Sequence, residues 1–198
     1  YRAFDPLLER NVALKVLYKT YAEHEDLVTS LAEEARKLAF ISRELNSDKK
    51  RVVEIYDFNK FNVKGIDGKE KGSIIAMIME YVEGGSLAKL MEAEKRKPIL
   101  KISKKVEILE QITEELTKLH DYDVIHGDIK PHNILLTKSL RPLLTDFGTA
   151  IVIQKYEEIV KPPILQYTPA YVAPETIEEG SISKSSDIYS LATLMIEL

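Results

Sequence analysis

Apolar and polar positions alternate in the first part of the chain, with the period of two that is typical of half-buried strands. The stretches that show this period are rich in β-branched and aromatic residues, and we predict strands at NVALKVLY (11–18), RVVEIYDF (51–58) and SIIAMIMEYV (73–82). Between the last two stretches, Asp67-Gly68 lies in a polar insert and predicts a solvated hairpin turn. From Glu25 to Leu45 the apolar residues recur every three or four positions, which predicts a helix.

The helical period dominates the second part of the chain. EGGS (83–86) is a candidate linker, and Ser86 is a good N-cap for a short helix that ends near Glu94. Two longer helices are predicted, at about Ser103–His120 and at Asp187–Leu198. The first of these would bury one stripe, made of Ile102, Val106, Leu109, Ile112, Leu116 and Leu119. Strands followed by helices predict an α+β fold.

One carboxylate lies in the apolar stripe of the helix at 25–45. Positions 27, 31, 34, 38, 41 and 45 fall within an arc of about 80° on a helix. Five of them are Leu or Ile, and the sixth is Glu34, whereas Glu33 lies about 100° away and can face water. A buried carboxylate needs a partner, and Lys15, in an apolar strand, is the natural one. The alternative, that Glu34 lies at the edge of the stripe and reaches solvent, stays open.

Composition narrows the class of protein. Hydrophobic residues make up 44% and charged residues 30% of the 198 residues, as in ordinary globular proteins. A net charge of −4 gives no reason to expect nucleic-acid binding. No cysteine is present, which excludes disulfides and suits a reducing cytoplasm. We expect no signal peptide and no membrane segment in these residues, and a cytoplasmic location.

VIHGDIKPHNILLT (124–137) combines apolar ends, which predict buried strand pieces, with a polar centre. Together with VALK, which holds Lys15, and DFG (146–148), it supplies what phosphoryl transfer needs. Asn133 and Asp146 offer hard oxygen ligands suited to Mg²⁺ or Mn²⁺. Asp128 can accept a hydroxyl proton, and Lys130 can stabilise charge on the moving phosphoryl group.

In these motifs the chain resembles the eukaryotic-type (Hanks-type) Ser/Thr protein kinases. Further segments match in the same order along the chain: YRAFDPLLERNVALKVL, MEYVEGGSL (79–87), TPAYVAPE (168–175) and KSSDIYSL (184–191). The resemblance implies a two-lobed kinase fold, with a small antiparallel-sheet lobe plus one helix in 1–82 and a larger helical lobe in 83–198. It implies transfer of the γ-phosphoryl group of ATP to Ser/Thr hydroxyls of protein substrates, with autophosphorylation possible.

The resemblance also assigns roles to single residues. Catalytic roles fall on Asp128, Lys130, Asn133, Lys15 and Glu34, and nucleotide contacts on Ala13, Lys15, Met79, Glu80, Val82, Leu135 and Asp146. The metal would be held by Asn133 and Asp146. Thr168, Pro174 and Glu175 would end the substrate loop, and His126, Phe147, Leu38 and Asp187 would be structural. His132, where the family often has Glu, is interpreted as a substrate-side or neutral position.

Gly127 departs from the family, which usually has arginine there to hold a phosphate on the activation loop. We therefore expect activity without phosphorylation of residues 149–168. The motif His-Gly-Asp is also common in aminoglycoside-type small-molecule kinases, which are one alternative to a protein kinase. A pseudokinase that binds partners without catalysis forms another.

No glycine-rich phosphate loop occurs in the sequence. We expect the chain to be a kinase domain truncated at both ends, inactive by itself. We also expect Leu191, Leu194, Met195 and Leu198 to form an exposed apolar patch.

Overall fold

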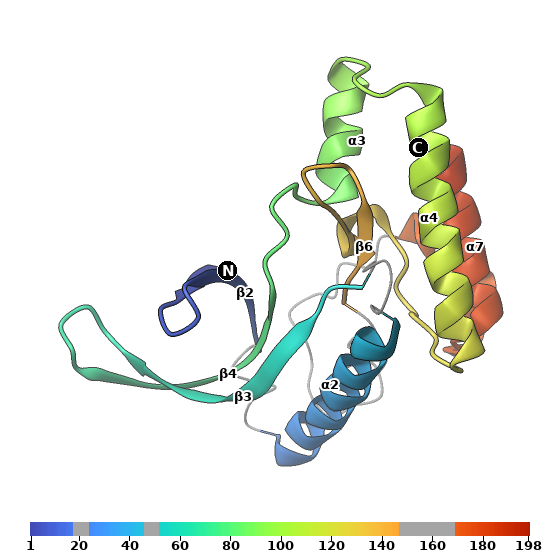
Figure 1. Ribbon diagram of the computed structural model, residues 1–198. Coiled ribbons are helices and arrows are strands. Elements are labelled where there is room, and N and C mark those ends of the chain that lie inside the picture. The colour runs from blue at the N-terminus through green and yellow to red at the C-terminus, as the bar shows by residue number, and fades with distance from the viewer. Residues whose placement is uncertain (18–23, 46–51, 147–168) are drawn as a thin grey trace. The chain divides into compact units, whose positions relative to one another are not determined.

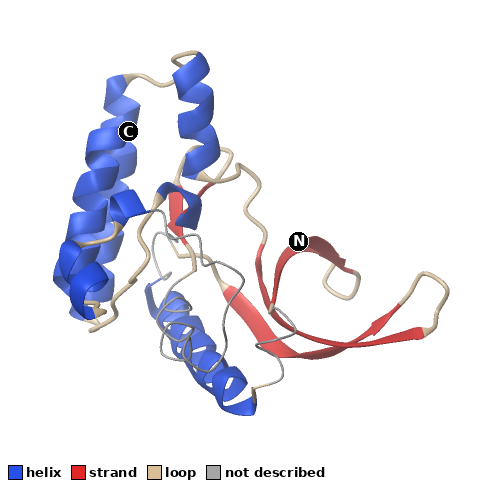
Figure 2. Ribbon diagram, turned by 180° about the vertical axis from the view of Figure 1, so that it is seen from behind, coloured by secondary structure: helices blue, strands red, loops and turns tan. Residues whose placement is uncertain are grey.

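The computed structural model describes residues 1–17, 24–45, 52–146 and 169–198. In the helix at 25–45 several side chains, those of Glu34 and Leu38 among them, lie outside the description. The described residues form two compact units, one of residues 1–17, 24–44 and 53–81, and one of residues 45, 52, 82–146 and 169–198. Strands dominate the first unit and helices the second (Figure 2).

The first unit is built on a four-stranded antiparallel sheet in the order β1-β2-β4-β3. Its strands are β1 (Arg2–Asp5), β2 (Arg10–Val16), β3 (Ile55–Lys64) and β4 (Glu70–Glu80). Helix α2 (Glu25–Leu45) lies beside the sheet in the first unit (Figure 1). Its bounds are those that the apolar period predicts. On α2, Leu31 and Ala35 are buried and Glu33 is exposed.

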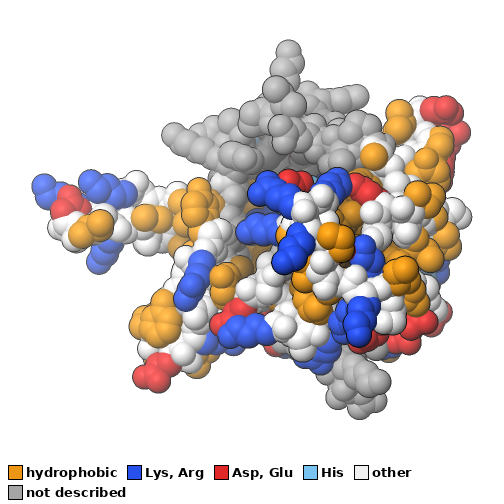
Figure 3. Space-filling model, turned by 90° about the horizontal axis from the view of Figure 1, so that it is seen from above, with side chains coloured by type: hydrophobic (Ala, Val, Ile, Leu, Met, Phe, Trp, Pro, Cys, Tyr) orange, Lys and Arg blue, Asp and Glu red, His pale blue; other side chains and the backbone are white. Residues whose placement is uncertain are grey.

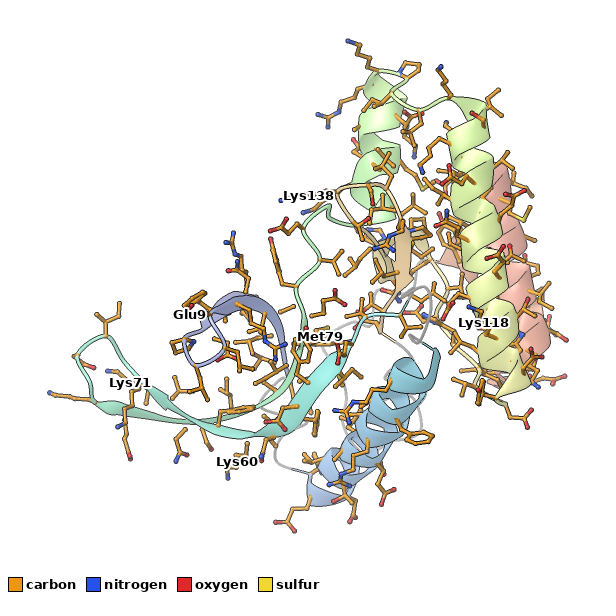
Figure 4. The ribbon with its side chains drawn as sticks, in the orientation of Figure 1. Glu9, Lys60, Lys71, Met79, Lys118 and Lys138 are labelled. Carbon is orange, nitrogen blue, oxygen red and sulfur yellow. The ribbon has the colours of Figure 1, made fainter. Side chains whose placement is uncertain are left out.

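The hairpin of β3 and β4 extends further than the sequence pattern predicts. Its ladder continues to Lys64 and Glu70, and the turn closes with a bond from Gly68 N–H to the Gly65 carbonyl, at 2.9 Å. Gly68 has a φ of +73°, which explains the glycine in the predicted Asp67-Gly68 turn. Lys60 and Lys71 extend from the two strands (Figure 4).

The predicted strand at 51–58 is partly wrong. Val52 and Val53 are buried but precede β3, which begins at Ile55. Val52 belongs to the second unit, where it forms an isolated parallel bridge with Leu144. Buried β-branched residues occur in isolated bridges as well as in regular strands. The local sequence pattern therefore could not show which of the two Val52 and Val53 belong to.

The second unit contains three long helices and a two-stranded sheet. The helices are α3 (Leu87–Arg96), α4 (Ile102–Asp121) and α7 (Lys184–Glu197), and the strands are β5 (Ile134–Leu136) and β6 (Pro142–Leu144). Ser86 caps α3 as predicted, accepting a bond from the Lys89 N–H at 3.4 Å. A 3₁₀ turn, η1 (Pro131–Asn133), precedes β5. A second one, η2 (Pro169–Tyr171), leads to the short helix α6 (Pro174–Glu179).

Helices α4 and α7 lie side by side (Figures 1 and 2). The predicted stripe on α4 is correct in its second half and wrong in its first, since Ile102 is 80% exposed and Val106 is 45% exposed. Ile108 is fully buried in their place. The first turns of α4 meet polar partners instead, because Lys105 binds Glu94 at 2.8 Å and the Leu198 carbonyl at 3.0 Å.

The predicted apolar patch on the last helix is also partly wrong. Leu191 and Leu194 are buried, whereas Met195 and Ile196 are exposed. Helix α7 begins at Lys184, three residues before the predicted start, because Ser183 and Ser186 form a reciprocal capping box. No helix within the described ranges has the length and hydrophobicity needed to cross a lipid bilayer.

Candidate active site

The loop from Val124 to Lys130 joins α4 to η1 and contains no strand, so the strand piece predicted at its start is wrong. The backbone of the loop bonds elsewhere. Val124 N–H donates to the Leu119 carbonyl at 2.9 Å and so completes the end of α4. The backbone N–H groups of His126 and Gly127 donate to a carboxylate. Strand pairing starts only at Ile134, in β5.

The carboxylate that meets this loop belongs to Asp187 in the first turn of α7. Its side chain is 1% exposed. Oδ2 accepts the His126 N–H and Oδ1 accepts the Gly127 N–H, both at 2.8 Å. His120 Nε2, on α4, lies 2.9 Å from Oδ2. Hydrogen bonds to a buried charge are among the stronger ones in proteins, so Asp187 fixes the loop to two helices.

Gly127 has a φ of +76°, in the left-handed region that side chains rarely adopt. This conformation lets two successive N–H groups, those of His126 and Gly127, point at one carboxylate. The glycine in the middle of the polar motif therefore has a structural reason in this chain.

Asp128 follows Gly127 and gathers two polar side chains. Asn133 Nδ2 donates to Asp128 Oδ2 at 2.6 Å and to the Asp128 carbonyl at 2.9 Å. Lys130 Nζ lies 2.8 Å from the same Oδ2. Among the described residues no group donates to the other carboxylate oxygen, Oδ1. The side chain is thus held in place while one of its oxygens stays available to a ligand.

The sheet of β5 and β6 brings Asn133 next to Asp146. Ile134 pairs with Leu144, and Thr145 N–H donates to the Asn133 carbonyl at 3.0 Å. Asn133 therefore directly precedes one strand, and Asp146 follows the end of its partner. Because Nδ2 of Asn133 bonds Asp128, its amide oxygen is the atom left for a cation. Asp146 is half-buried, with a φ of +63°.

In the first unit, the predicted nucleotide contacts share one face of the sheet. Ala13 pairs with Met79 and Lys15 with Met77 across β2 and β4. Residues two apart on a strand face the same side, so Lys15 lies on the same face as Ala13 and Met79. Lys15 is half-buried, and Met79 lies near the end of β4 (Figure 4). Glu80 N–H donates to the Glu54 carbonyl at 2.9 Å.

The sequence profile described as "Protein kinase domain" matches residues 1–198. The chain belongs to the protein kinase family. It is 32% identical, over 198 residues, to serine/threonine-protein kinase PknL of Mycobacterium tuberculosis, covering 100% of this chain and 45% of the relative. Serine/threonine-protein kinase PrkC of Bacillus subtilis is 31% identical over 198 residues, which are 100% of this chain and 28% of the relative.

A third relative is PknA of Corynebacterium glutamicum, which is 30% identical over 196 residues. The match covers 99% of this chain and 39% of PknA. The chain thus spans less than half the length of these curated relatives. Membership of the protein kinase family confirms the two-lobed α+β fold that the motifs predict. All three relatives are named serine/threonine-protein kinases, which does not favour the small-molecule kinase or the pseudokinase.

Some residues predicted for this kinase domain lie outside the described part. They are Phe147 of DFG, Thr168 of the substrate loop, and the side chains of Glu34 and Leu38. The activation loop at 149–168 falls there as well. Among the described ones, Val82, Leu135, Pro174 and Glu175 belong to the second unit. Pro174 opens α6 at its first position, and Glu175 is half-buried. His132, at the family's frequent Glu position, is exposed.

His126 is fully buried in the loop that bears Asp128, and the structural role assigned to it stays a prediction. Its Nδ1 accepts the Asp128 N–H at 3.3 Å. Burial lowers the pKa of His126 below the ordinary 6.5, and the nearby carboxylates of Asp187, Asp128 and Asp146 only partly oppose this. The imidazole is therefore neutral at pH 7.

We expect the kinase domain to lose stability as the pH falls below about 6.5, in part through His126. In that range the unfolded chain binds a proton at this imidazole more readily than the folded chain. The free energy of unfolding therefore decreases as the pH decreases. Urea unfolding at about pH 7.5 and pH 5.5 measures the loss, which should be smaller in His126→Gln. His132→Gln, at an exposed histidine, is the control. Equal losses in the wild type and His126→Gln would contradict the prediction.

Three further contacts of the kinase domain were not predicted from the sequence. His120 meets Asp187, Ser190 Oγ donates to the Tyr171 carbonyl at 2.6 Å, and Tyr171 OH donates to Glu197 Oε2. Each joins residues 19 to 67 positions apart. Tyr171 lies in TPAYVAPE, and Asp187 and Ser190 lie in KSSDIYSL, two segments that match the kinase family. No local period in the sequence indicates the contacts themselves.

Proposed function

We propose that this domain transfers the γ-phosphoryl group of ATP to Ser or Thr hydroxyls of protein substrates. The observation that carries the proposal is the loop held by Asp187, in which Asp128 keeps one carboxylate oxygen available while Lys130 and Asn133 hold the other. A substrate hydroxyl near Asp128 Oδ1 would be oriented and would give up its proton there. The two compact units are, in this proposal, the two lobes of the kinase.

The chemistry follows from these positions. The hydroxyl oxygen forms a bond to the γ-phosphorus, the bond from that phosphorus to the β–γ bridging oxygen breaks, and ADP leaves. The hydroxyl proton goes to Asp128. Lys130, 2.8 Å from Asp128, can also reach the charge that develops on the transferred group.

Asn133 and Asp146 are the residues that would hold Mg²⁺ or Mn²⁺. Their donors are one amide oxygen and one carboxylate, and the described residues contain no group of three or more His, Cys, Asp or Glu side chains that could hold a metal ion by itself. A small donor set suits Mg²⁺, which is usually bound by one or two carboxylates together with substrate phosphates and water. When bound, the ion would neutralise phosphate charge.

In the first unit we propose that Lys15 binds phosphate and that Ala13, Met79 and the Glu80 backbone contact adenine. We propose the adenine role for Val82 and Leu135 in the second unit. Glu34 would hold Lys15 in place. Support comes from the shared sheet face of Ala13, Lys15 and Met79 and from the exposure of Glu33, which leaves the neighbouring position for the inward carboxylate.

We expect Glu34→Gln to lower kcat/KM by about tenfold or more, because Lys15 would lose the charge that holds it. Glu33→Gln removes the same charge from an exposed position of α2 and should leave kcat/KM nearly unchanged. Steady-state kinetics of both variants in the full-length protein measure the difference. Equal losses, or a loss confined to Glu33→Gln, would show that the helical phase assigned here is wrong.

The function is tested by following phosphate from γ-labelled ATP into protein, in the full-length protein, with and without a chelator. Transfer that stops on chelation and returns with added Mg²⁺ supports the proposal, and label on the kinase itself would show autophosphorylation. Hydrolysis of ATP without labelled protein would contradict it. We place the domain in the cytoplasm, where ATP is present, and the lack of cysteine agrees with a reducing compartment.

A further inference from the structure

The connection between α3 and α4 concentrates positive charge. Residues 94–105, with the sequence EKRKPILKISKK, contain six of the 28 lysines and arginines of the chain but one of its 32 acidic residues. The six cations are Lys95, Arg96, Lys97, Lys101, Lys104 and Lys105. The chain as a whole has a net charge of −4, so this segment differs in sign from the remainder.

The one acidic residue of the segment, Glu94, is used inside the connection. Its side chain is 10% exposed. Oε1 accepts the N–H groups of Ile99 and Leu100, and Oε2 lies 2.8 Å from Lys105 Nζ. Glu94 therefore neutralises Lys105 and fixes the backbone of the connection, and five cations remain around it.

These five cations are weakly paired or unpaired. In the described part of the chain, no acidic group forms an ion pair with Lys97 or Lys101, and both lysines are exposed. The other three form the pairs Lys95–Glu197, Arg96–Glu92 and Lys104–Glu107. Side chains in these pairs are between 26% and 79% exposed. Solvent screens such pairs, so their cations can exchange a carboxylate for another anion.

Apolar side chains lie among these cations. Ile102 is 80% exposed, Ile99 is 58% exposed and Val106 is 45% exposed. Ile102 and Val106 are one turn apart on α4 and share a face of the helix. Seen from above, hydrophobic side chains lie among Lys and Arg side chains near the centre of the view (Figure 3). Exposed apolar side chains that are gathered in one place and rimmed by charge are typical of an interaction surface.

The place of the connection favours a flat partner over a bound peptide. In Figures 1 and 2 the connection forms one end of the second unit, beyond α7 and β6. A projecting end can contact a flat surface, whereas a peptide is usually bound in a groove or at a sheet edge.

The mixture of side chains distinguishes a lipid surface from nucleic acid. Nucleic acid would engage the cations through its phosphates but would leave the isoleucines without a partner. Residues 94–105 contain no aromatic side chain on which bases could stack. An anionic bilayer offers headgroup phosphates to the cations and acyl chains to the isoleucines.

We propose that this surface binds the anionic phospholipids of a membrane. We call it the basic end, and it consists of Lys95, Arg96, Lys97, Ile99, Lys101 and Ile102. Ile99 and Ile102 enter the boundary between headgroups and acyl chains, while the cationic heads lie at the phosphates. The contact holds the second unit at a membrane surface. It uses none of the residues to which we assign catalysis, so it does not depend on the proposed kinase activity.

The test places a reporter in the basic end of the full-length protein. Residues 1–198 contain no cysteine, so Ser103→Cys provides one site in this domain for an environment-sensitive dye. Ser103 is exposed and follows Ile102. Vesicles of phosphatidylcholine with about one third phosphatidylserine should shift the dye emission to the blue. The shift should be small with phosphatidylcholine alone and should weaken at high salt. Ser185→Cys, at an exposed serine in the first turn of α7, is the control and should show no shift.

Two double variants in the labelled protein separate charge from apolar insertion, and vesicle titration gives the partition constant. Lys97→Ala combined with Lys101→Ala should lower the constant about 25-fold, which is about fivefold for each lysine. Ile99→Ser combined with Ile102→Ser should lower it about tenfold or more with the charge unchanged. All four side chains are exposed, so urea unfolding should match that of the wild type.

The matched controls lie in the hairpin of β3 and β4. Lys60→Ala combined with Lys64→Ala makes the same change of charge at two exposed lysines. Ile66→Ser removes a fully exposed isoleucine. Both controls should leave the partition constant nearly unchanged.

Three results would overturn the proposal. One is the absence of a shift at Ser103 with anionic vesicles, or an equal shift at Ser185. Another is an equal loss of binding in the hairpin controls and in the variants of the basic end. The third is a loss in the lysine variant with none in the isoleucine variant, which would assign the surface to an acidic protein segment.

Discussion

Replacing Asp128 with Asn lowers the rate of phosphoryl transfer by about 10²–10⁴, the usual effect of removing a general base, and leaves ATP binding nearly unchanged. Asparagine has the shape of aspartate, but its amide cannot take the hydroxyl proton, and it gives up the ion pair that Lys130 forms with Oδ2 at 2.8 Å. The nucleotide is bound, in our proposal, by other residues. The effect should therefore appear in kcat while the dissociation constant for ATP stays the same.

Steady-state kinetics and calorimetric ATP titration of the full-length protein measure the two quantities. Asp123→Asn is the matched control, because it makes the same change at an exposed carboxylate just before this loop, and it should retain kcat. Near-normal turnover by Asp128→Asn would refute the role of Asp128. A parallel loss of ATP binding would instead show that the substitution disturbs the loop.

Replacing Asp187 with Ala should have the largest effect on folding stability. The carboxylate is 1% exposed and accepts the N–H groups of His126 and Gly127, which lie where water cannot easily replace it. Leaving two such donors unsatisfied costs about 1–3 kcal/mol each, so we expect the free energy of unfolding to fall by roughly 2–6 kcal/mol. Activity should fall as well, because Asp128 directly follows Gly127.

Urea unfolding of the full-length protein, followed by a signal from the kinase domain, measures this loss. Asp123→Ala is the control, since Asp123 is an exposed carboxylate paired with Lys184 at 2.6 Å. The Lys184 ammonium lowers the pKa of Asp123, but solvent screens a pair at the surface, and stability should change little. If the two variants were equally stable, Asp187 would not hold the loop.

The sequence was sufficient to predict elements whose residues settle their own conformation. Helix α2 has the predicted bounds because its apolar period runs over 21 residues, and Ser86 caps α3 because a serine before a helix can do so by itself. The elements that differ from the prediction are those whose conformation or burial depends on residues far away in the sequence. Val52 pairs with Leu144, and Lys105 draws the first turns of α4 toward polar groups.

The candidate site divides in the same way. Asp128, Lys130 and Asn133 could be recognised together because they lie within six residues, and the structure brings their polar atoms together. The contacts of Tyr171 with Ser190 and Glu197 could not be predicted, because they join two segments that only folding brings together. Asp187 was assigned from family resemblance, and its two bonds to the loop span about 60 residues of chain.

The most direct test of the central claim is to identify the residue that receives the phosphate. The full-length protein is incubated with γ-labelled ATP, Mg²⁺ and a protein substrate, and the phosphoamino acids of the product are separated, beside an Asp128→Asn sample. We predict label on Ser or Thr from the wild type and almost none from the variant. Label confined to a small hydroxylated metabolite, or Ser/Thr label undiminished in Asp128→Asn, would contradict the account.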